Sequence, residues 1–200
     1  MVRRVVFFVM ALGFASLLMG CGPRWQVVHQ TTPSPLVNQR SFAVLPIEYS
    51  GLRVGEKTEA QYLSEKDAKQ QESFQADKDA LNQNFARALI EGAAGDAINV
   101  ALATGPSAAP FEIRPVVTFI EPGFYAVVAS MPSEVHMTLR ITLPNGQVID
   151  EITLAHSTDS RSGFSVGGIS MNPSSGGRLR KDGEGLGEIV AKYLRERVGG

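Results

Sequence analysis

The chain of 200 residues has little of three residue types that often carry chemistry: one cysteine, three histidines and one tryptophan. A single cysteine excludes an intramolecular disulfide framework, and three scattered histidines offer little material for a metal site. Nineteen basic and twenty acidic side chains give a formal charge of −1, so the broad basic field of a nucleic-acid-binding protein is missing too. The remaining composition, 44% hydrophobic and 20% charged, is typical of an ordinary globular domain.

Sequence motifs of the common enzyme classes are missing as well. There is no Walker loop, and the glycines near residues 163–168 have the wrong spacing for a dinucleotide-binding loop. Ser170 lacks the second glycine of a nucleophile elbow. None of His29, His136 and His156 has a histidine, glutamate or aspartate four positions away, the spacing of two ligands on one face of a helix. We therefore expect no cofactor, no metal and no enzymatic activity.

The first 21 residues have the pattern of an export signal. Arg3 and Arg4 supply a short positive region, and residues 5–19 follow without a charge. A transmembrane helix needs roughly 20 apolar residues, so a run of this length is typical of a secretory signal instead. The only cysteine, Cys21, comes after Gly20 at the end of this run.

The sequence Leu18-Met19-Gly20-Cys21 resembles the lipobox of bacterial lipoproteins, with leucine three positions before the cysteine and a small residue directly before it. The resemblance implies that the chain is cut before Cys21 and that acyl chains such as palmitate are attached to this residue. Acyl chains hold a soluble domain to a bilayer almost permanently, because each buried CH₂ contributes about 0.8 kcal/mol. The alternative is an ordinary signal peptide with an incidental cysteine.

The position after the cysteine bears on the destination of the protein. Cleavage before Cys21 would leave 180 residues with 17 basic and 20 acidic side chains, a formal charge of −3. Gly22 follows the cysteine, whereas an aspartate there retains lipoproteins in the inner membrane of enteric bacteria. By this resemblance we expect a protein of the cell envelope that crosses the periplasm and is lipid-anchored in the cell outer membrane. Retention in the inner membrane is the alternative.

Three segments follow from this interpretation. Residues 1–20 are a lipoprotein signal peptide, residues 21–40 are the lipidated N-terminus and an extended tether, and residues 41–200 are one α+β domain. Trp25 has two alternatives within the tether. Its ring lies at the level of the lipid headgroups, or it packs on the domain as an extra strand together with Val27 and Val28.

Hydrophobic periodicity predicts the order strand, helix, strands, hairpin, helix. This order predicts an α+β fold, a two-layer sandwich of a mostly antiparallel sheet with two helices packed on one face, after the signal peptide and flexible tether. The elements behind it are strands at residues 41–49 and 112–121, loop at 51–61, a helix that starts near Ser64 and Asp67 and ends near Gly92 or Gly95, a hairpin around Asn145-Gly146, and a helix from an N-cap at Asp182 to Gly199.

The hairpin has the clearest register. Its two-residue loop at residues 145–146 sets Leu143 opposite Val148 on the apolar face. The same register places Asp150 opposite Ile141 on that face, where a lone carboxylate costs free energy unless it is paired. An exposed sheet edge or a partner from the following loop explains this carboxylate, and a functional role is the alternative.

Candidate binding residues gather after the hairpin. His156 precedes a serine- and glycine-rich segment, residues 157–177, of a length that is often functional or mobile. A small basic cluster, Arg178, Arg180 and Lys181, follows this segment. Its possible contacts are solvent, an acidic partner or lipid headgroups. Cys21 is the candidate lipidation site, and the candidate binding residues are Asp150, His156, Arg178, Arg180 and Lys181.

The element order and the lipobox together resemble small outer-membrane lipoproteins with a TolB-N-terminal-like or transport-auxiliary-like α+β domain, with Gly183-Glu184-Gly185-Leu186-Gly187 leading into Tyr193-Leu194 as the matching sequence. This resemblance implies a non-enzymatic accessory or assembly factor that binds a protein of a larger envelope machine. The alternatives are a ligand or lipid carrier, with a cleft under residues 157–177, and a hydrolase acting on envelope polymers. Adjacent Asp150 and Glu151 point to opposite faces of a strand, which disfavours the paired carboxylates of such a hydrolase.

Overall fold

The computed structural model describes residues 24–105, 108–126, 129–159, 164–166, 169–171 and 175–199. In this part of the chain, no helix is both long and apolar enough to cross a membrane. The elements follow in the order β1 (Trp25–Gln30), β2 (Ser41–Val44), β3 (Arg53–Val54), β4 (Lys57–Thr58), α1 (Glu59–Ser64), α2 (Ala68–Ala94), β5 (Asn99–Leu102), β6 (Glu112–Glu121), β7 (Phe124–Ala126), β8 (Ala129–Met131), β9 (Ser133–Thr142), β10 (Val148–Thr158), β11 (Phe164–Val166), β12 (Ile169–Met171) and α3 (Ser175–Gly199).

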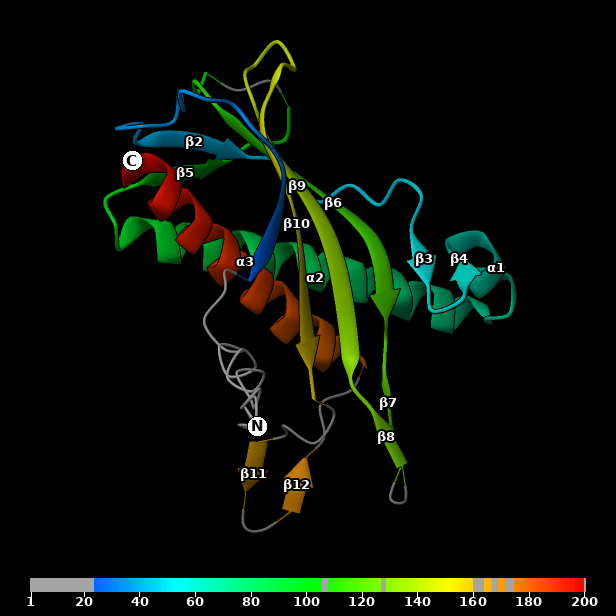
Figure 1. Ribbon diagram of the computed structural model, residues 1–200. Coiled ribbons are helices and arrows are strands. Elements are labelled where there is room, and N and C mark those ends of the chain that lie inside the picture. Colours follow the sequence, from blue (N-terminus) through cyan, green and yellow to red (C-terminus); the bar gives the residue numbers. More distant parts are fainter. Residues whose placement is uncertain are drawn as a thin grey trace, which may run out of the picture.

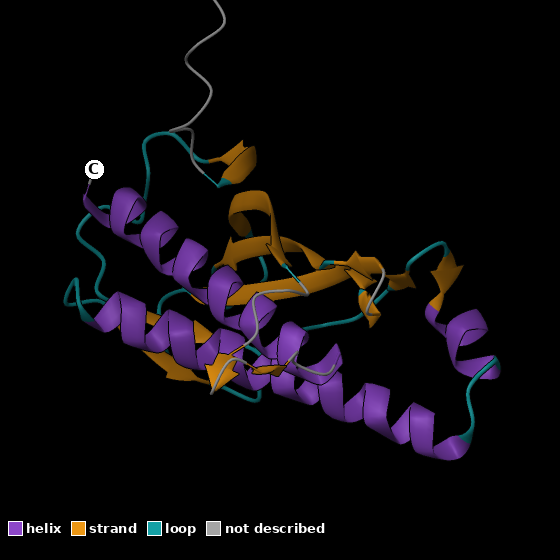
Figure 2. Cartoon of the chain, turned by 90° about the horizontal axis from the view of Figure 1, so that it is seen from below, coloured by secondary structure: helices purple, strands orange, loops and turns teal. Residues whose placement is uncertain are grey.

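Among the described residues, eight strands form one open mixed sheet with the order β1-β10-β9-β6-β2-β5, to which β3 and β4 are added beside β6. The strands from β1 to β6 in this order are antiparallel to their neighbours. Helices α2 and α3 pack on each other and cover one face of the sheet (Figures 1 and 2). The predicted α+β sandwich with two helices on one face is confirmed.

The strands at the edge opposite β1 are parallel, because β2 runs in the same direction as both β5 and β6. A parallel pair needs a long crossover connection, and the chain between β2 and β5 supplies one in α2. The loop predicted for residues 51–61 is wrong in part, since this segment contains β3, β4 and the start of α1. Thr58 caps α1 in a capping box with Gln61.

The predicted register of the hairpin is confirmed over most of β9 and β10, including Asp150 opposite Ile141. It is wrong next to the turn, where a bulge between Val148 and Asp150 sets Val148 opposite Thr142 instead of Leu143. The extra residue of a bulge bends the strand and increases its local twist. Asp150 nevertheless keeps its predicted side of the sheet and faces the helices.

The structure decides between the two alternatives for Trp25 in favour of the extra strand, although Val27 and Val28 of this strand do not pack and are 52% and 58% exposed. Trp25 pairs with Leu154 at the edge of the sheet, is only 7% exposed, and packs edge-to-face on Tyr193 with ring centroids 5.4 Å apart. Leu36, further along the expected tether, is buried as well. The extended tether predicted for residues 21–40 is therefore corrected from Trp25 onward, because burial and ladder hydrogen bonds hold this segment on the domain.

Helix α2 begins and ends close to the prediction. Asp67 is its N-cap and forms a capping box with Gln70, and Gly95 is its C-cap. The buried positions begin at Phe74, so the polar first turns of the helix are exposed. The second half of α2 packs against α3 and the sheet.

Helix α3 is longer than expected, and the N-cap predicted at Asp182 is wrong. The helix begins seven residues earlier, at Ser175, so that Asp182 lies inside it. The many glycines in this segment argued against a helix, because glycine costs about 1 kcal/mol relative to alanine. Close packing explains them: a Cβ at Gly183 would lie 2.5 Å from the carbonyl oxygen of Leu81, and one at Gly187 equally close to that of Phe85.

Candidate functional site

The predicted lipidation site, Cys21, lies outside the described residues, as does the signal peptide predicted for residues 1–20. Its distance along the chain from the domain is nevertheless known. Strand β1 begins at Trp25, four residues after the cysteine. A lipid anchor on Cys21 would thus hold the domain on a much shorter connection than a tether to residue 40.

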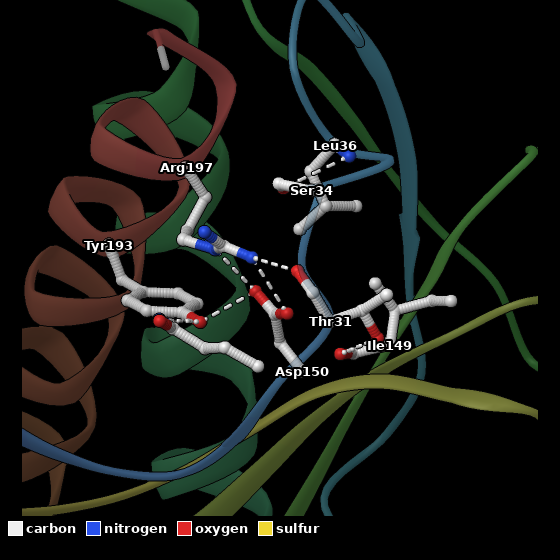
Figure 3. Close-up of polar contacts among 8 residues, drawn as sticks. Thr31, Ser34, Leu36, Ile149, Asp150, Tyr193 and Arg197 are labelled. Carbon is white, nitrogen blue, oxygen red and sulfur yellow. Dashed lines mark hydrogen bonds and ion pairs between the residues drawn. The ribbon is translucent and has the colours of Figure 1, made fainter.

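Asp150 is fully buried on the helix side of β10 and is surrounded by donors (Figure 3). Its Oδ2 accepts hydrogen bonds from the Tyr193 hydroxyl at 2.7 Å and from Nε of Arg197 at 2.6 Å. A second guanidinium nitrogen of Arg197 donates to Oδ1 at 3.0 Å and to the carbonyl oxygen of Thr31 at 3.4 Å. Gln30 completes the network by donating to the Tyr193 hydroxyl at 3.1 Å.

This network ties the edge strand and β10 to the last helix. The hydrogen bond to Asp150 raises the pKa of Arg197, and burial, followed by the same carboxylate, raises the pKa of Tyr193. The partner of Asp150 comes from α3, not from the loop after the hairpin as expected. Since both carboxylate oxygens are occupied by groups of the same chain, the geometry gives Asp150 a structural role.

A second buried polar cluster surrounds Asp182, the residue predicted as an N-cap. Its Oδ2 accepts a hydrogen bond of 2.6 Å from the Ser133 hydroxyl, and its Oδ1 accepts one of 2.6 Å from the Thr158 hydroxyl. The same Oδ1 lies 2.9 Å from Nδ1 of His156. Because Ser133 begins β9 and Thr158 ends β10, the cluster fixes one end of the hairpin to α3.

Serine, histidine and aspartate meet in this cluster, but not in the order that nucleophilic catalysis requires. A catalytic triad places the imidazole between the hydroxyl and the carboxylate, so that the histidine can take the proton of the serine. Here the buried Ser133 hydroxyl donates directly to Asp182. The other imidazole nitrogen of His156 faces the backbone of α3, where a Cβ at Gly185 would overlap it. The arrangement stabilises the fold and does not activate a nucleophile.

The predicted basic cluster is divided by the helix. Arg178 is buried, and its guanidinium donates to the carbonyl oxygens of Pro122 at 2.9 Å and Gly123 at 3.0 Å. Arg180 and Lys181 lie on the surface. The structure therefore uses Arg178 to hold the turn between β6 and β7 and leaves the other two accessible to solvent.

Two short hairpins leave the sheet where these polar groups lie. Strands β7 and β8 form one hairpin, which follows Pro122 and Gly123, the residues bound by Arg178, and precedes Ser133. Strands β11 and β12 form the other hairpin, which follows Thr158. Both project beyond the same end of the sheet, at the bottom of Figure 1. The periodicity of the sequence did not reveal the buried cluster that supports this end.

The face of the sheet opposite the helices contains an open cavity of about 480 Å³. His136 lines this cavity, and its Nε2 lies 2.7 Å from Oε1 of Glu134. Within the described ranges, no group of three or more histidine, cysteine, aspartate or glutamate side chains is placed to hold a metal ion. Three threonine hydroxyl groups contribute to its polar lining together with an arginine, a glutamine and a histidine; the lining residues are Arg24, Trp25, Gln26, Thr118, His136, Met137, Thr138, Thr153, Leu154 and Ala155.

The chain is thus an α+β domain with two buried polar clusters and two projecting hairpins. No family model matches its sequence, and no curated protein matches it. Solved structures to which the chain is similar include the PelC dodecamer from Paraburkholderia phytofirmans (TM-score 0.45, 16% identity, covering 84% of this chain and 97% of that one). Others are the hypothetical protein CT253 from Chlamydia trachomatis (0.44, 15%, 78% and 96%) and protein XCC0632 from Xanthomonas campestris (0.46, 11%, 84% and 90%).

Proposed function

We propose that this protein is a lipid-anchored lipoprotein of the bacterial cell envelope, in the outer membrane, that serves as a non-enzymatic accessory or assembly factor for a larger envelope machine. The observation that carries the proposal is the position of Cys21. The only cysteine of the chain stands at the end of an uncharged run, in a sequence that resembles a lipobox. A folded domain begins four residues later, as it would in a protein that lipid holds at a membrane.

The residues that were candidates for chemistry support a binding role over catalysis. Asp150 is bound by Arg197 and Tyr193, and His156 is held against Asp182. Each of these groups stabilises a junction between the sheet and α3. A general acid or base must reach the proton that it transfers, and the buried Asp150 does not reach the surface.

The test of the anchor is a Cys21→Ser variant expressed with its own signal sequence. We expect the wild-type protein to be cut before Cys21, to carry acyl chains and to float with membranes, and we expect the variant to remain an uncut precursor. Met19→Ala is the matched control, since it changes the same segment and leaves Leu18, Gly20 and Cys21 in place. A Cys21→Ser variant with normal mature mass and normal membrane fractionation would refute the anchor.

The test of the accessory role is cross-linking in intact envelopes, followed by purification and mass spectrometry. One stoichiometric envelope protein, captured by the wild type and lost with Cys21→Ser, supports the role and identifies the machine. Capture of no protein by an abundant, folded chain would favour the second candidate, a carrier of a polar ligand. The observation behind this second candidate is the open cavity of about 480 Å³ on the free face of the sheet.

A further inference from the structure

The path of β1 relates the proposed anchor to one end of the domain. β1 runs antiparallel to β10, and Trp25 pairs with Leu154, so residues before Trp25 lead toward the end of β10 at Thr158. Trp25 is the fourth residue after Cys21, and an extended chain of four residues spans at most about 14 Å. Acyl chains on Cys21 therefore enter a bilayer near this end of the sheet. The opposite end, at the 145–146 turn, is out of their reach.

The two projecting hairpins leave the sheet at this same end. β7 and β8 follow the end of β6, and β11 and β12 follow the end of β10. Figure 1 shows both hairpins below the sheet, on the side to which the first described residues also lead. The last helix ends at the opposite end of the sheet (Figure 1), where the Val198 carbonyl accepts a backbone hydrogen bond from Asn38.

The composition of the hairpins suits the interface of a bilayer. Residues 122–133 and 162–177 contain no aspartate, glutamate, lysine or arginine, although a fifth of the whole chain is charged. Phe124 is 48% exposed and Met131, its partner across the β7–β8 pair, is 37% exposed. A contiguous apolar patch on a surface marks a site of contact with a protein or a membrane, and Phe124 and Met131 contribute adjoining apolar surface at this hairpin.

The base of the β7–β8 hairpin is firmly held. Gly123 has a φ of +65°, and a Cβ at this position would lie 2.6 Å from the carbonyl oxygen of Met131. The Arg178 guanidinium binds the carbonyl oxygens of Pro122 and Gly123. Phe124 is therefore presented at a fixed position relative to the sheet, which lowers the entropy lost when it enters an interface.

We infer that the β7–β8 and β11–β12 hairpins rest on the same bilayer into which the acyl chains of Cys21 insert, so that the domain stands on the membrane by its hairpin end. This inference rests on the proposed lipid anchor, because the anchor determines which end of the sheet meets the lipid. Buried apolar area at the interface adds to the acyl chains as a second attachment. The cavity on the open face of the sheet then lies beside the membrane surface, since Arg24 and Trp25 line it.

The experiment measures the depth of single tryptophans in the lipidated full-length protein, purified and reconstituted in phosphatidylethanolamine and phosphatidylglycerol vesicles with brominated acyl chains. Trp25, the only natural tryptophan, is replaced by phenylalanine, and a new one is introduced as Phe124→Trp. Leu102→Trp is the matched control, because Leu102 is 70% exposed and lies at the other end of the sheet, where β5 pairs with β2. We expect bromine quenching and a blue-shifted emission for Phe124→Trp and neither for Leu102→Trp.

Equal quenching in the Phe124→Trp and Leu102→Trp variants, or no quenching in Phe124→Trp, would overturn the inference. If the same protein carries acyl mass and floats with membranes, the proposed anchor still holds. A chain without acyl mass that fails to float would refute the anchor and the inference together. Circular dichroism checks the fold of the variants. Photoactivatable acyl-chain lipids added to the unaltered protein give an independent readout: we expect labelled peptides from residues 122–133 or 162–177. Labels confined to segments other than these hairpins, or cross-links from these hairpins to another protein only, would contradict the inference.

Discussion

Removing the Asp150 carboxylate is the perturbation that tests the most heavily bonded group of the core. In the folded protein this fully buried carboxylate receives hydrogen bonds from Tyr193 and from two nitrogens of Arg197. Asp150→Ala leaves the guanidinium without its counter-charge. Because the Arg197 side chain is only 18% exposed, water can replace the lost partner only in part.

The structure gives the size of the effect. Breaking a buried ion pair by removing one partner costs about 3–5 kcal/mol, and the partial exposure of Arg197 places Asp150→Ala near the lower value. For a chain of this length, a loss of about 3 kcal/mol lowers the Tm by about 6–12 °C. Arg197→Ala, which leaves the carboxylate buried, is also expected to cost several kcal/mol. The double variant should cost less than the sum, with a coupling of at least about 1 kcal/mol.

The assay is urea unfolding of the mature chain followed by the fluorescence of Trp25, which packs on Tyr193 and reports on this region. Arg195→Ala is the control on the same helix, because its ion pair with Asp96 is long, at 3.5 Å, and exposed. We expect this control to change the stability by less than about 1 kcal/mol. Strictly additive single variants, or an Asp150→Ala loss no larger than the control, would refute the account of this network.

Gly185→Ala should displace His156 from Asp182, because the new Cβ overlaps the imidazole; urea unfolding is expected to show a net loss of about 1 kcal/mol after the gain in helix propensity. In a His156→Ala background the same change should be stabilising, and a loss of equal size in both backgrounds would contradict the contact. The second prediction concerns alkaline pH. Burial raises the pKa of Tyr193 above its ordinary value of 10.0, so the folded state retains the proton longer, and its contribution to stability is present below pH 10 and is lost above it. Tyr193→Phe should reduce the decline in urea midpoint above about pH 10, and an unchanged pH dependence would contradict this assignment.

Local patterns in the sequence predicted the parts of the fold that short-range physics determines. The hairpin register follows from the 145–146 turn and from alternation, and the start of α2 follows from the cap at Asp67. Helix α3 was misjudged because its glycines lower helix propensity. These glycines let α2 approach α3 closely at Gly183 and Gly187. This approach is a tertiary contact, so a local sequence pattern does not reveal it.

The candidate site was harder to predict than the fold for the same reason. The sequence pattern placed Asp150 on the apolar face, but its partner Arg197 is 47 residues away, on an element whose packing no local pattern determines. Asp182 has a residue type that often caps helices, but its carboxylate instead accepts hydrogen bonds from the hydroxyl groups of Ser133 and Thr158 on two strands. Buried polar groups must be satisfied, so the sequence indicated that partners exist without showing where they are.

The intact mass of the protein isolated from envelopes shows whether lipid on Cys21 holds the domain at a membrane. We expect a chain that begins at Cys21 and carries the added mass of acyl chains, confirmed on its N-terminal peptide. A chain that retains Met1, or one that begins after the signal sequence with an unmodified cysteine, would contradict the proposed anchor.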